Sequence, residues 1–291
     1  MSGSVVTVPV KKFEGASSTA IDDLLAVEEP LEIRIGDRPV SVTMRTPGHD
    51  FDLAAGFLFS EAIVTDVAQI QTIRYTQMQG NPRRAGNSIT VDLKPGVEID
   101  LDRLERHFYT SSSCGVCGKA SIEAVESTGC SLLPHDGPII PARVIHQLPG
   151  ALRQSQAVFD RTGGLHASAL FQPDGTLLAI REDVGRHNAL DKLIGAEFLA
   201  GRAPLADRIL LVSGRSSFEL VQKTVMAGIP VLAAVGAPST LAVELAQRFQ
   251  LTLLGFVRGE RFNIYSGSWR IGDGRDVPQF LSPQDVGGRP A

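Results

Sequence analysis

Cysteine is scarce in this sequence, because the 291 residues include only Cys114, Cys117 and Cys130. Three thiols cannot build the disulfide framework of a small secreted protein, so the count fits a reducing cytoplasm. Aromatic side chains that stack on the bases of single-stranded nucleic acid are also few, with one Trp and three Tyr. The 28 Lys and Arg against 32 Asp and Glu leave a formal charge of −4, without the basic surplus of a nucleic-acid-binding surface.

Long hydrophobic segments are missing as well. The longest apolar runs, such as residues 229–238, reach only about half of the ~20 residues that a membrane-spanning helix needs. Residues 1–12 have no apolar core flanked by basic residues, so they do not resemble a secretory signal. We therefore expect a cytoplasmic protein that binds neither membranes nor nucleic acids.

Residues 30–108 predict a small α+β domain, which follows a loose segment over 1–29. Apolar residues alternate on both sides of Gly36-Asp37, and this pattern is typical of a β-hairpin. Asp50 is suited to cap the start of a helix. The expected elements are a hairpin over 31–45, a helix over 50–58 and strands over 69–75 and 88–93.

Residues 142–267 show a different pattern, in which short apolar strands alternate with amphipathic helices. This alternation is typical of right-handed βαβ units in a covered parallel sheet. The expected elements are helices over 142–158, 186–200, 218–227 and 239–249, a hairpin over 166–171 and 177–181, and strands over 209–212, 231–235 and 252–257. Residues 109–141 form a cysteine loop and linker in this division, and residues 268–291 form a C-terminal tail.

The order of helix, hairpin, helix and alternating strands is similar to that of cytidine deaminases. We therefore predict an α/β protein with a deaminase-like three-layer α/β/α core. Deaminase chemistry requires a zinc-bound water held by an H-x-E motif and a later P-C-x-x-C motif. His166-Ala167-Ser168 lacks the glutamate, and no cysteine follows residue 130. We expect the fold without the deaminase reaction.

The first candidate site is Cys114-Gly115-Val116-Cys117, in a stretch of Ser and Gly that predicts an exposed loop. With Cys130 and His135 the spacing is C-x2-C-x12-C-x4-H, which a zinc site tolerates. A nearby Lys119 and the start of a helix expected over 119–126 would instead favour a Cys117 thiolate and sulfur chemistry. Incidental buried cysteines are a weaker interpretation among such polar neighbours. The residues alone leave zinc binding and thiolate chemistry open.

The second candidate site lies where three expected strands end. Ligands bind beyond the carboxyl ends of strands in such sheets, and a helix that begins there points its N–H groups at an anion. The loops are Ser213-Gly214-Arg215-Ser216-Ser217, Gly236-Ala237-Pro238-Ser239-Thr240 and Arg258-Gly259-Glu260-Arg261. Gly and Ser also cap ordinary helices, but three such loops with three arginines favour a phosphate-bearing ligand. Neither a Walker A nor a G-x-G-x-x-G motif is present, so an ordinary ATPase or dehydrogenase is not indicated.

The third candidate site is a polar string over 181–192, directly after the hairpin that begins with His166. It brings Asp183, Arg186 and His187 to the start of one helix. Two histidines beside an aspartate are compatible with catalysis, and a capped, solvated helix start is compatible with the same residues. The sequence does not decide between a catalytic and a structural role for His166, Asp183 and His187.

Together these stretches resemble the FdhD family, the formate dehydrogenase accessory sulfurtransferases, over about residues 30–267. The string Glu182-Asp183-Val184-Gly185-Arg186-His187-Asn188-Ala189-Leu190-Asp191-Lys192 is the most specific part of the resemblance. Further matching stretches are Gly56-Phe57-Leu58-Phe59-Ser60-Glu61, Cys114-Gly115-Val116-Cys117-Gly118, Thr162-Gly163-Gly164-Leu165-His166-Ala167, Ser213-Gly214-Arg215-Ser216-Ser217-Phe218-Glu219, Val221-Gln222-Lys223, Thr240-Leu241-Ala242-Val243-Glu244 and Gly255-Phe256-Val257.

The resemblance implies a sulfurtransferase that formate dehydrogenase requires. Such a protein accepts sulfur from a cysteine desulfurase as a cysteine persulfide. It passes the sulfur to the bis-molybdopterin guanine dinucleotide form of the molybdenum cofactor before that cofactor is inserted into formate dehydrogenase. By position, Cys114 would hold the persulfide and Cys117 would be its partner. The resemblance also implies a homodimer.

Cofactor binding is implied for Phe256, Val257, Arg258, Gly259, Glu260 and Arg261. Because this segment coincides with the predicted anion site, we add Arg215, Ser216, Ser217 and His187 as cofactor-binding residues. GDP should serve as a mimic of the cofactor, and no permanently bound metal is expected. Cys130 is not required by the family pattern. The main alternative is a zinc-stabilised chaperone that binds the molybdenum cofactor without transferring sulfur.

Overall fold

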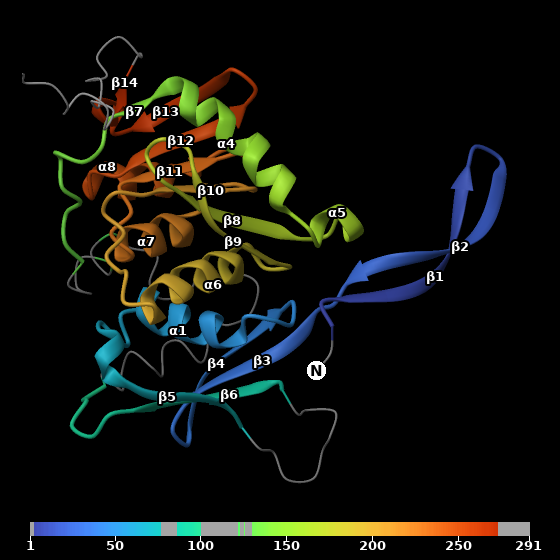
Figure 1. Ribbon diagram of the computed structural model, residues 1–291, viewed down its shortest axis with the longest axis horizontal. Coiled ribbons are helices and arrows are strands. Elements are labelled where there is room, and N and C mark those ends of the chain that lie inside the picture. The colour runs from blue at the N-terminus through green and yellow to red at the C-terminus, as the bar shows by residue number, and fades with distance from the viewer. Residues whose placement is uncertain (1–2, 77–85, 100–121, 123–124, 126–129, 273–291) are drawn as a thin grey trace, which may run out of the picture.

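A six-stranded sheet organises the C-terminal half of the protein (Figure 1). The structure is a computed structural model, and it describes residues 3–76, 86–99, 122, 125 and 130–272. The strand order is β13-β12-β11-β10-β8-β9. The strands are β8 (His166–Phe171), β9 (Leu177–Asp183), β10 (Ile209–Val212), β11 (Val231–Ala234), β12 (Thr252–Arg258) and β13 (Arg261–Ser266). β10, β11 and β12 are parallel, and β8 is antiparallel to both β9 and β10. The carboxyl ends of β9, β10, β11 and β12 therefore lie along one edge.

Helices cover both faces of this sheet, because alternate strand side chains point to opposite faces. In β10, Leu210 and Val212 pack among α6, α7 and α8, whereas Ile209 and Leu211 pack against α4. The helices are α4 (Ala142–Ser155), the short α5 (Phe159–Thr162), α6 (Arg186–Leu199), α7 (Phe218–Met226) and α8 (Thr240–Arg248). The predicted α/β class is confirmed, and the expected helices and strands of this half are present with ends shifted by a few residues.

The N-terminal unit is a four-stranded sheet with the order β4-β3-β6-β5. Its strands are β3 (Glu29–Ile35), β4 (Arg38–Arg45), β5 (Ile70–Tyr75) and β6 (Ser88–Leu93). Helix α1 (Asp50–Ser60) and a short 3-10 helix, η1 (Val67–Gln69), complete it. The hairpin, the helix and the two strands expected from the sequence are therefore present. Figure 1 shows α1 between this sheet and α6 of the larger half.

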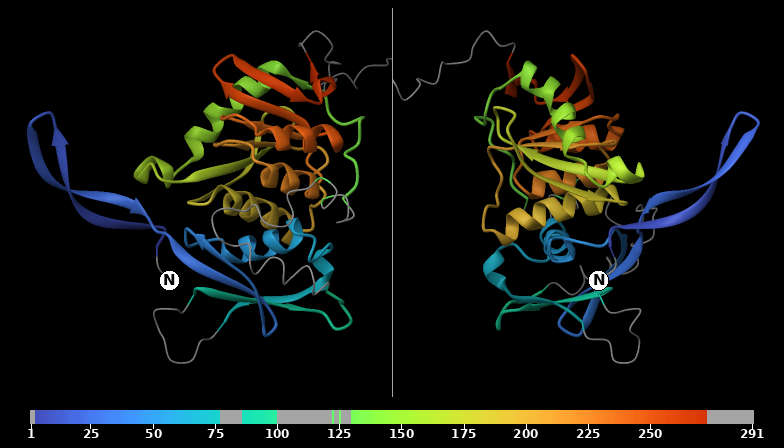
Figure 2. Two further views of the ribbon diagram at one scale, coloured as in Figure 1. Left: turned by 180° about the vertical axis from the view of Figure 1, so that it is seen from behind. Right: turned by 45° about the vertical axis from the view of Figure 1, so that its right-hand side comes forward.

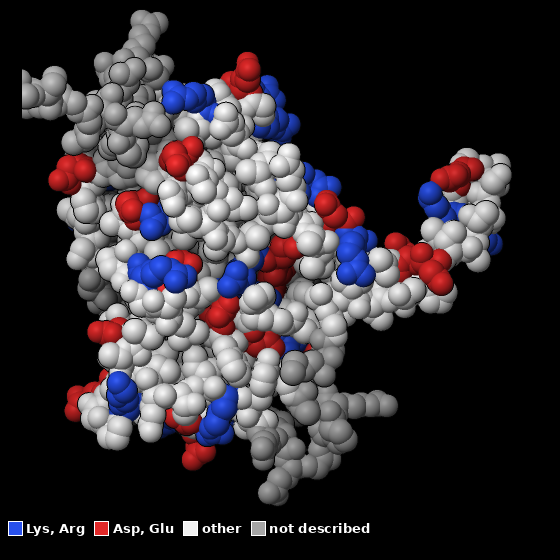
Figure 3. Space-filling view, in the orientation of Figure 1, with Lys and Arg blue, Asp and Glu red and all other residues white. Residues whose placement is uncertain are grey.

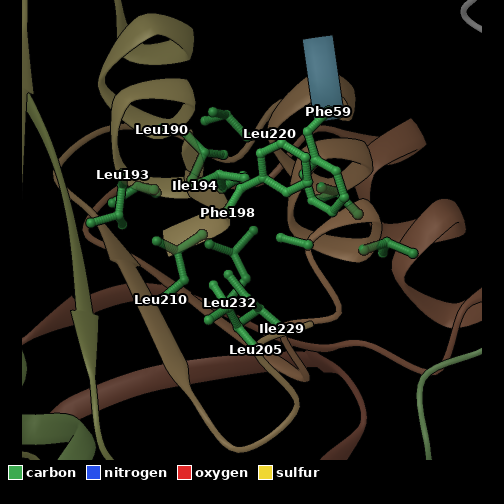
Figure 4. Close-up of a cluster of buried hydrophobic side chains, with 14 of the residues drawn as sticks. Phe59, Leu190, Leu193, Ile194, Phe198, Leu205, Leu210, Leu220, Ile229 and Leu232 are labelled. Carbon is green, nitrogen blue, oxygen red and sulfur yellow. The ribbon is translucent and has the colours of Figure 1, made fainter. Parts of the chain in front are cut away.

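Helices α1 and α6 approach each other as closely as backbones allow, through Gly56 and Gly195. A Cβ atom on Gly56 would lie 1.9 Å from the Asp191 carbonyl oxygen, and one on Gly195 would lie 1.8 Å from the Asp52 carbonyl oxygen. Beside this crossing, Phe59 and Phe198 stack with ring centroids 4.5 Å apart (Figure 4). The two halves consequently share one hydrophobic core that runs from Leu31 of β3 to Leu253 of β12.

Residues 5–26 form a projecting hairpin, so the expectation of a loose segment over 1–29 is wrong there. Strands β1 (Val5–Glu14) and β2 (Ser17–Ala26) pair antiparallel along their whole length. Figure 2 shows this hairpin reaching away from the rest of the molecule. The alternation of Val6, Val8 and Val10 is the strand signal, and Gly15 adopts the positive φ of +62° that the turn needs.

The chain after the last predicted strand also belongs to the fold. β13 pairs antiparallel with β12, and β14 (Ile271–Gly272) pairs in parallel with β7 (Ile140–Pro141). Between them, Arg270 is fully buried in the 3-10 helix η3 (Ser268–Arg270) and donates hydrogen bonds to the carbonyls of Gln250 and Pro134. The predicted tail over 268–291 is therefore wrong for residues 268–272. Within the described ranges, no helix is long and apolar enough to cross a membrane.

Candidate functional site

Two of the three loops predicted to bind an anion, 213–217 and 236–240, lie side by side at the carboxyl edge of the large sheet, and the second pairs with β12 two residues before the Arg258–Arg261 turn. The Gly236 N–H donates to the Gly214 carbonyl at 2.9 Å, and the Phe256 N–H donates to the Gly236 carbonyl at 3.0 Å. Ser239 N–H donates in turn to the Ser216 carbonyl at 3.0 Å. These bonds continue the sheet pairing past the ends of β10 and β11, beside the last residues of β12. They fix the loops next to one another without using the side chains.

Helices α6, α7 and α8 begin at the same edge, because each follows a strand that ends there. The N-terminus of α8 is capped by Ser239, whose Oγ accepts from the Ala242 N–H at 3.3 Å. The N-cap of α7 is Ser217, and that of α6 is Gly185; neither makes a side-chain cap bond. Two of the three helix starts therefore keep N–H groups that can face an anionic ligand.

Cationic side chains surround this edge. Arg258 and Arg261 face each other across the turn between β12 and β13, where Gly259 has a φ of +53°. Arg215, Arg258 and Arg261 are all exposed. None of the three forms an ion pair with another described residue. They are therefore free to contact phosphate oxygens.

Two neighbours of these arginines differ in what they offer a ligand. Phe256 is 39% exposed and has a positive φ of 55°, so its ring is presented at the edge. Val257 is fully buried in the core under α4, and only its backbone can contact a ligand. Ser216 is 1% exposed, and its Oγ has no hydrogen-bond partner among the described residues.

His187, the histidine of α6, contacts the start of α7. Its Nε2 lies 3.3 Å from the Ser217 Oγ and 3.8 Å from a Glu219 carboxylate oxygen. Burial, followed by the cations of Arg186 and Lys223, lowers the pKa of His187 to about 4 against the opposing carboxylates. The imidazole is therefore neutral near pH 7. His187 and Ser217 together form an uncharged part of the carboxyl edge.

A pocket of about 570 Å³ opens on the α4 side of this edge. The pocket lies where β8 begins and where β10 and β11 end, between α4 and α5. Its walls include Leu152, Gln156, Phe159, Gly164, His166 and Ser213. A largely apolar pocket of this volume with a few polar groups is typical of a small-molecule site. The sequence predicted a role for His166 but not the pocket. The pocket walls come from α4 and α5 as well as from the strands, and these segments are brought together only by folding.

Two polar groups in this pocket keep unused hydrogen-bonding capacity. The Ser213 Oγ accepts from the Ala167 N–H at 2.9 Å, which leaves its own proton free to donate. The His166 ring has no hydrogen bond to any residue that the structure describes. Burial and then the nearby Arg186 lower the pKa of His166, with Asp183 opposing them. A neutral imidazole and a free hydroxyl can therefore orient an uncharged heterocycle.

The sequence and the fold have counterparts in known proteins. The sequence model of the FdhD/NarQ family matches residues 26–272. The chain belongs to this family. A protein named sulfur carrier protein FdhD from Streptomyces avermitilis is 53% identical over 262 residues, which cover 89% of this chain and 92% of the relative. Its namesake from Mycolicibacterium paratuberculosis is 51% identical over 267 residues, 90% of this chain and 97% of the relative.

A solved structure agrees with this assignment. It is the crystal structure of a candidate formate dehydrogenase accessory protein from Desulfotalea psychrophila. The match has a TM-score of 0.71 at 25% identity, and it covers 92% of this chain and 99% of that chain. The resemblance to the FdhD family is thus confirmed over residues 26–272.

The polar string over 181–192, the most specific part of the resemblance, holds the two halves together. Asp183 is fully buried, and its carboxylate lies 2.6 Å from the Lys192 ammonium group. The same carboxylate accepts from the Thr46 N–H at 3.1 Å and from the Asn188 amide at 3.1 Å. Lys192 also donates to the Thr46 carbonyl at 2.8 Å. Asp183 therefore has a structural role between β4 and α6, and it is too buried to meet a ligand.

A second buried cluster joins α1, α6 and α7. The Lys223 ammonium group lies 3.0 Å from Asp191 and 3.2 Å from Glu61, and it donates to the Ser60 Oγ at 2.8 Å. Burial lowers the pKa of Lys223, but the two carboxylates outweigh it and the pKa is raised overall. These charges were not predicted as a pair, because sequence spacing does not show that α1 lies against α6 and α7.

The candidate cysteine site lies mostly outside the described residues, since Cys114 and Cys117 are not among them. Cys130 is half-buried against the shared core, and burial raises the pKa of its thiol to about 11. His135 stacks on Trp269 with ring centroids 4.6 Å apart. Over the described ranges, no three His, Cys, Asp or Glu side chains are grouped to hold a metal. The zinc ligand set that the sequence allowed also needs Cys114 and Cys117, so it stays a prediction.

Proposed function

We propose that this protein is a sulfur carrier that serves formate dehydrogenase. It accepts sulfur from a cysteine desulfurase and delivers it to the bis-molybdopterin guanine dinucleotide cofactor before the cofactor enters the enzyme. Membership of the FdhD/NarQ family supports the sulfur-carrying role. The observation that carries the cofactor-binding part is the carboxyl edge, where three neighbouring loops present unpaired arginines beside a pocket.

Sulfur transfer begins with Cys114 in this proposal. A Cys114 thiolate attacks the sulfane sulfur of the donor's persulfide, a new S–S bond forms on Cys114, and the donor cysteine leaves as a thiolate. The S–S bond on Cys114 then breaks, Cys114 returns as a thiolate, and the terminal sulfur passes to the cofactor at the oxidation level of a neutral atom. To be held there as a sulfide ligand, this sulfur would take two electrons from the reduced cofactor that accepts it. In this proposal Cys117 attacks the terminal sulfur of the Cys114 persulfide, accepts it and releases the Cys114 thiolate, which keeps the loading step reversible. Cys130 takes no part, because its thiol stays protonated near pH 7.

The cofactor is the substrate that the carboxyl edge would bind. Its phosphates would contact Arg215, Arg258 and Arg261 and the open N-termini of α6 and α7. One of its heterocycles would enter the pocket, where the neutral His166 ring and the Ser213 hydroxyl can donate and accept hydrogen bonds. Phe256 offers an exposed ring for stacking next to the arginines.

The sheet is proposed to be deaminase-like. An antiparallel hairpin, β8 and β9, precedes three parallel strands that are each connected by a helix, and this order supports the assignment. We also propose a cytoplasmic location and a homodimer, both of which suit a carrier that meets a desulfurase and a client enzyme.

The proposal is tested in cells that lack this protein and are complemented with variants. Cys114→Ala should leave formate dehydrogenase inactive, whereas the matched control Cys130→Ala should restore it. Both variants should accumulate to the same level, which shows that the fold is intact. Full dehydrogenase activity with Cys114→Ala would overturn sulfur transfer and favour the chaperone alternative. Stoichiometric zinc that is lost with Cys130→Ala would point to the same alternative.

A further inference from the structure

Glu182 of β9 connects that strand to α5, the short helix between α4 and β8. One oxygen of its carboxylate accepts from the Val158 N–H at 3.0 Å, and the other accepts from the Phe159 N–H at 2.9 Å. These two N–H groups lie at the start of α5, where a helix has no acceptor of its own to offer them. Hydrogen bonds to an ionised carboxylate are among the strongest in proteins. Glu182 therefore holds the start of α5.

The pairing of β8 with β9 explains why the Glu182 side chain reaches α5. Glu182 lies opposite Ala167, and directly paired residues share one face of the sheet. Ala167 belongs to the core cluster that packs against α4, so Glu182 extends from the α4 face. The next residue, Asp183, points to the other face, where it meets Lys192 of α6. Figure 1 shows α5 at the outer end of α4, beside β8 and β9.

The other contacts of α5 are exposed. All four of its residues are at least partly exposed. Asp160 forms an ion pair with Arg153 of α4, but the two side chains are 50% and 55% exposed, and such pairs contribute little. Figure 3 shows charges of both signs on the surface where Figure 1 places α5. The outer side of α5 contacts β2, whose own residues are mostly exposed. The two bonds to Glu182 are therefore the strongest restraint on α5.

The same segment forms one wall of the pocket beside His166. Phe159 of α5 lines the pocket, and so do Gly163, Gly164 and Leu165, which connect α5 to β8. Glu182 is not among the described residues that line it. A ligand binds such a pocket only in the fraction of molecules whose wall is in place, so its apparent affinity depends on how firmly α5 is held.

We propose that Glu182 is a positioning residue for this pocket, which holds α5 where the ligand needs a wall and does so without contacting the ligand. When the two hydrogen bonds to Glu182 are lost, α5 detaches and the pocket opens along the side that carries Phe159. The inference rests on the proposed function, because the ligand of this pocket is there a heterocycle of the cofactor. GDP is the probe of that ligand in the tests.

Hydrogen exchange of the backbone amides, followed by NMR, tests the hold on α5. In Glu182→Gln the amides of Val158 and Phe159 should exchange at least about tenfold faster, because a neutral amide oxygen replaces a carboxylate. Glu197→Gln is the matched control, since Glu197 also accepts two hydrogen bonds, from Arg202, at the far end of α6. It should leave both amides unchanged.

Three results of the exchange experiment would overturn the inference. They are unchanged exchange in Glu182→Gln, the same acceleration in Glu197→Gln, and an acceleration spread evenly over all helices, which would mark a merely structural role. In the wild-type chain, saturating GDP should slow exchange at Val158 and Phe159, because the wall closes on the ligand.

Calorimetric titration with GDP tests the effect on the pocket. Glu182→Gln should raise the dissociation constant at least about threefold, mainly through faster dissociation. Phe159→Ala removes the ring from the wall and should also weaken binding. In the double variant the two effects should not add, because both act through α5.

The outcomes of the titration separate this inference from the proposed function. Wild-type affinity in Glu182→Gln, or additive effects in the double variant, would overturn the role of Glu182 and leave the cofactor site intact. A wild-type chain that binds no GDP would instead overturn the cofactor site, and this inference with it.

Discussion

Lys223 of α7 lies 3.0 Å from the Asp191 carboxylate of α6, and both side chains are buried where α1 joins the two halves. A charge buried at such a place is strongly destabilising when its partner is lost. Asp191→Asn keeps the size of the side chain but removes its charge. Because Lys223 keeps its pair with Glu61, the change should lower the free energy of unfolding by about 2 kcal/mol, measured by urea titration. Arg74→Ala, which breaks the exposed pair with Asp92, should change it by less than about 1 kcal/mol.

The contact of α1 with α6 depends on two glycines. Gly56→Ala would place a Cβ 1.9 Å from the Asp191 carbonyl oxygen, so the helices must move apart. The thermal midpoint should fall by several degrees, because overpacking of this kind costs about 1–3 kcal/mol. Gly150→Ala in α4 is the control, since its Cβ would meet nothing within 4 Å. That change should raise the midpoint slightly, and equal effects of the two variants would contradict the close crossing.

The loss of folding stability at acidic pH should depend on His187. Its pKa is about 4 in the folded protein against a usual value of 6.5, so the unfolded chain binds the proton more readily between these values. The contribution of His187 to the free energy of unfolding is therefore fully present above pH 6.5, and it is lost as the pH falls toward 4. In His187→Gln, the urea midpoint should decline less steeply over this interval than in the wild-type chain. Parallel pH profiles for the two proteins would show that His187 titrates normally.

Nucleotide binding should depend on the arginines of the carboxyl edge. Isothermal titration with GDP should give a measurable affinity that falls with added salt. Arg261→Ala should weaken it about tenfold or more, because a charge-assisted hydrogen bond to phosphate is worth about 1.5–3 kcal/mol. Arg74→Ala removes the same charge from the distant N-terminal sheet and should have no effect. Unchanged affinity for Arg261→Ala would remove this residue from the site.

The sequence predicted the strands of the large sheet and the adjacency of their end loops, because short apolar runs and helix-opening Ser and Gly are local signals. It missed the projecting hairpin of β1 and β2, since the alternation of Val6, Val8 and Val10 is short and polar residues follow it over 11–23. The pocket beside His166 was also missed, because its walls come from α4 and α5.

The string over 181–192 shows the limit most plainly. Its density of polar residues left a catalytic and a structural role open. In the structure, Asp183, Asp191 and Lys192 are buried against α1, β4 and α7. Sequence spacing shows which residues share a helix, but not which charged residue on another element each one meets. The close crossing of α1 and α6 at Gly56 and Gly195 brings these charged residues into contact with their partners and so joins the two halves.

The central claim, sulfur carried on Cys114, is tested most directly by mass spectrometry of the intact chain and its peptides. The protein is incubated with a cysteine desulfurase and cysteine and is then digested without reductant. The account predicts a gain of about 32 Da, one sulfur atom, on the peptide that contains Cys114, with none on the peptide that contains Cys130. A Cys114 peptide that stays unmodified while the desulfurase itself carries a persulfide would contradict it.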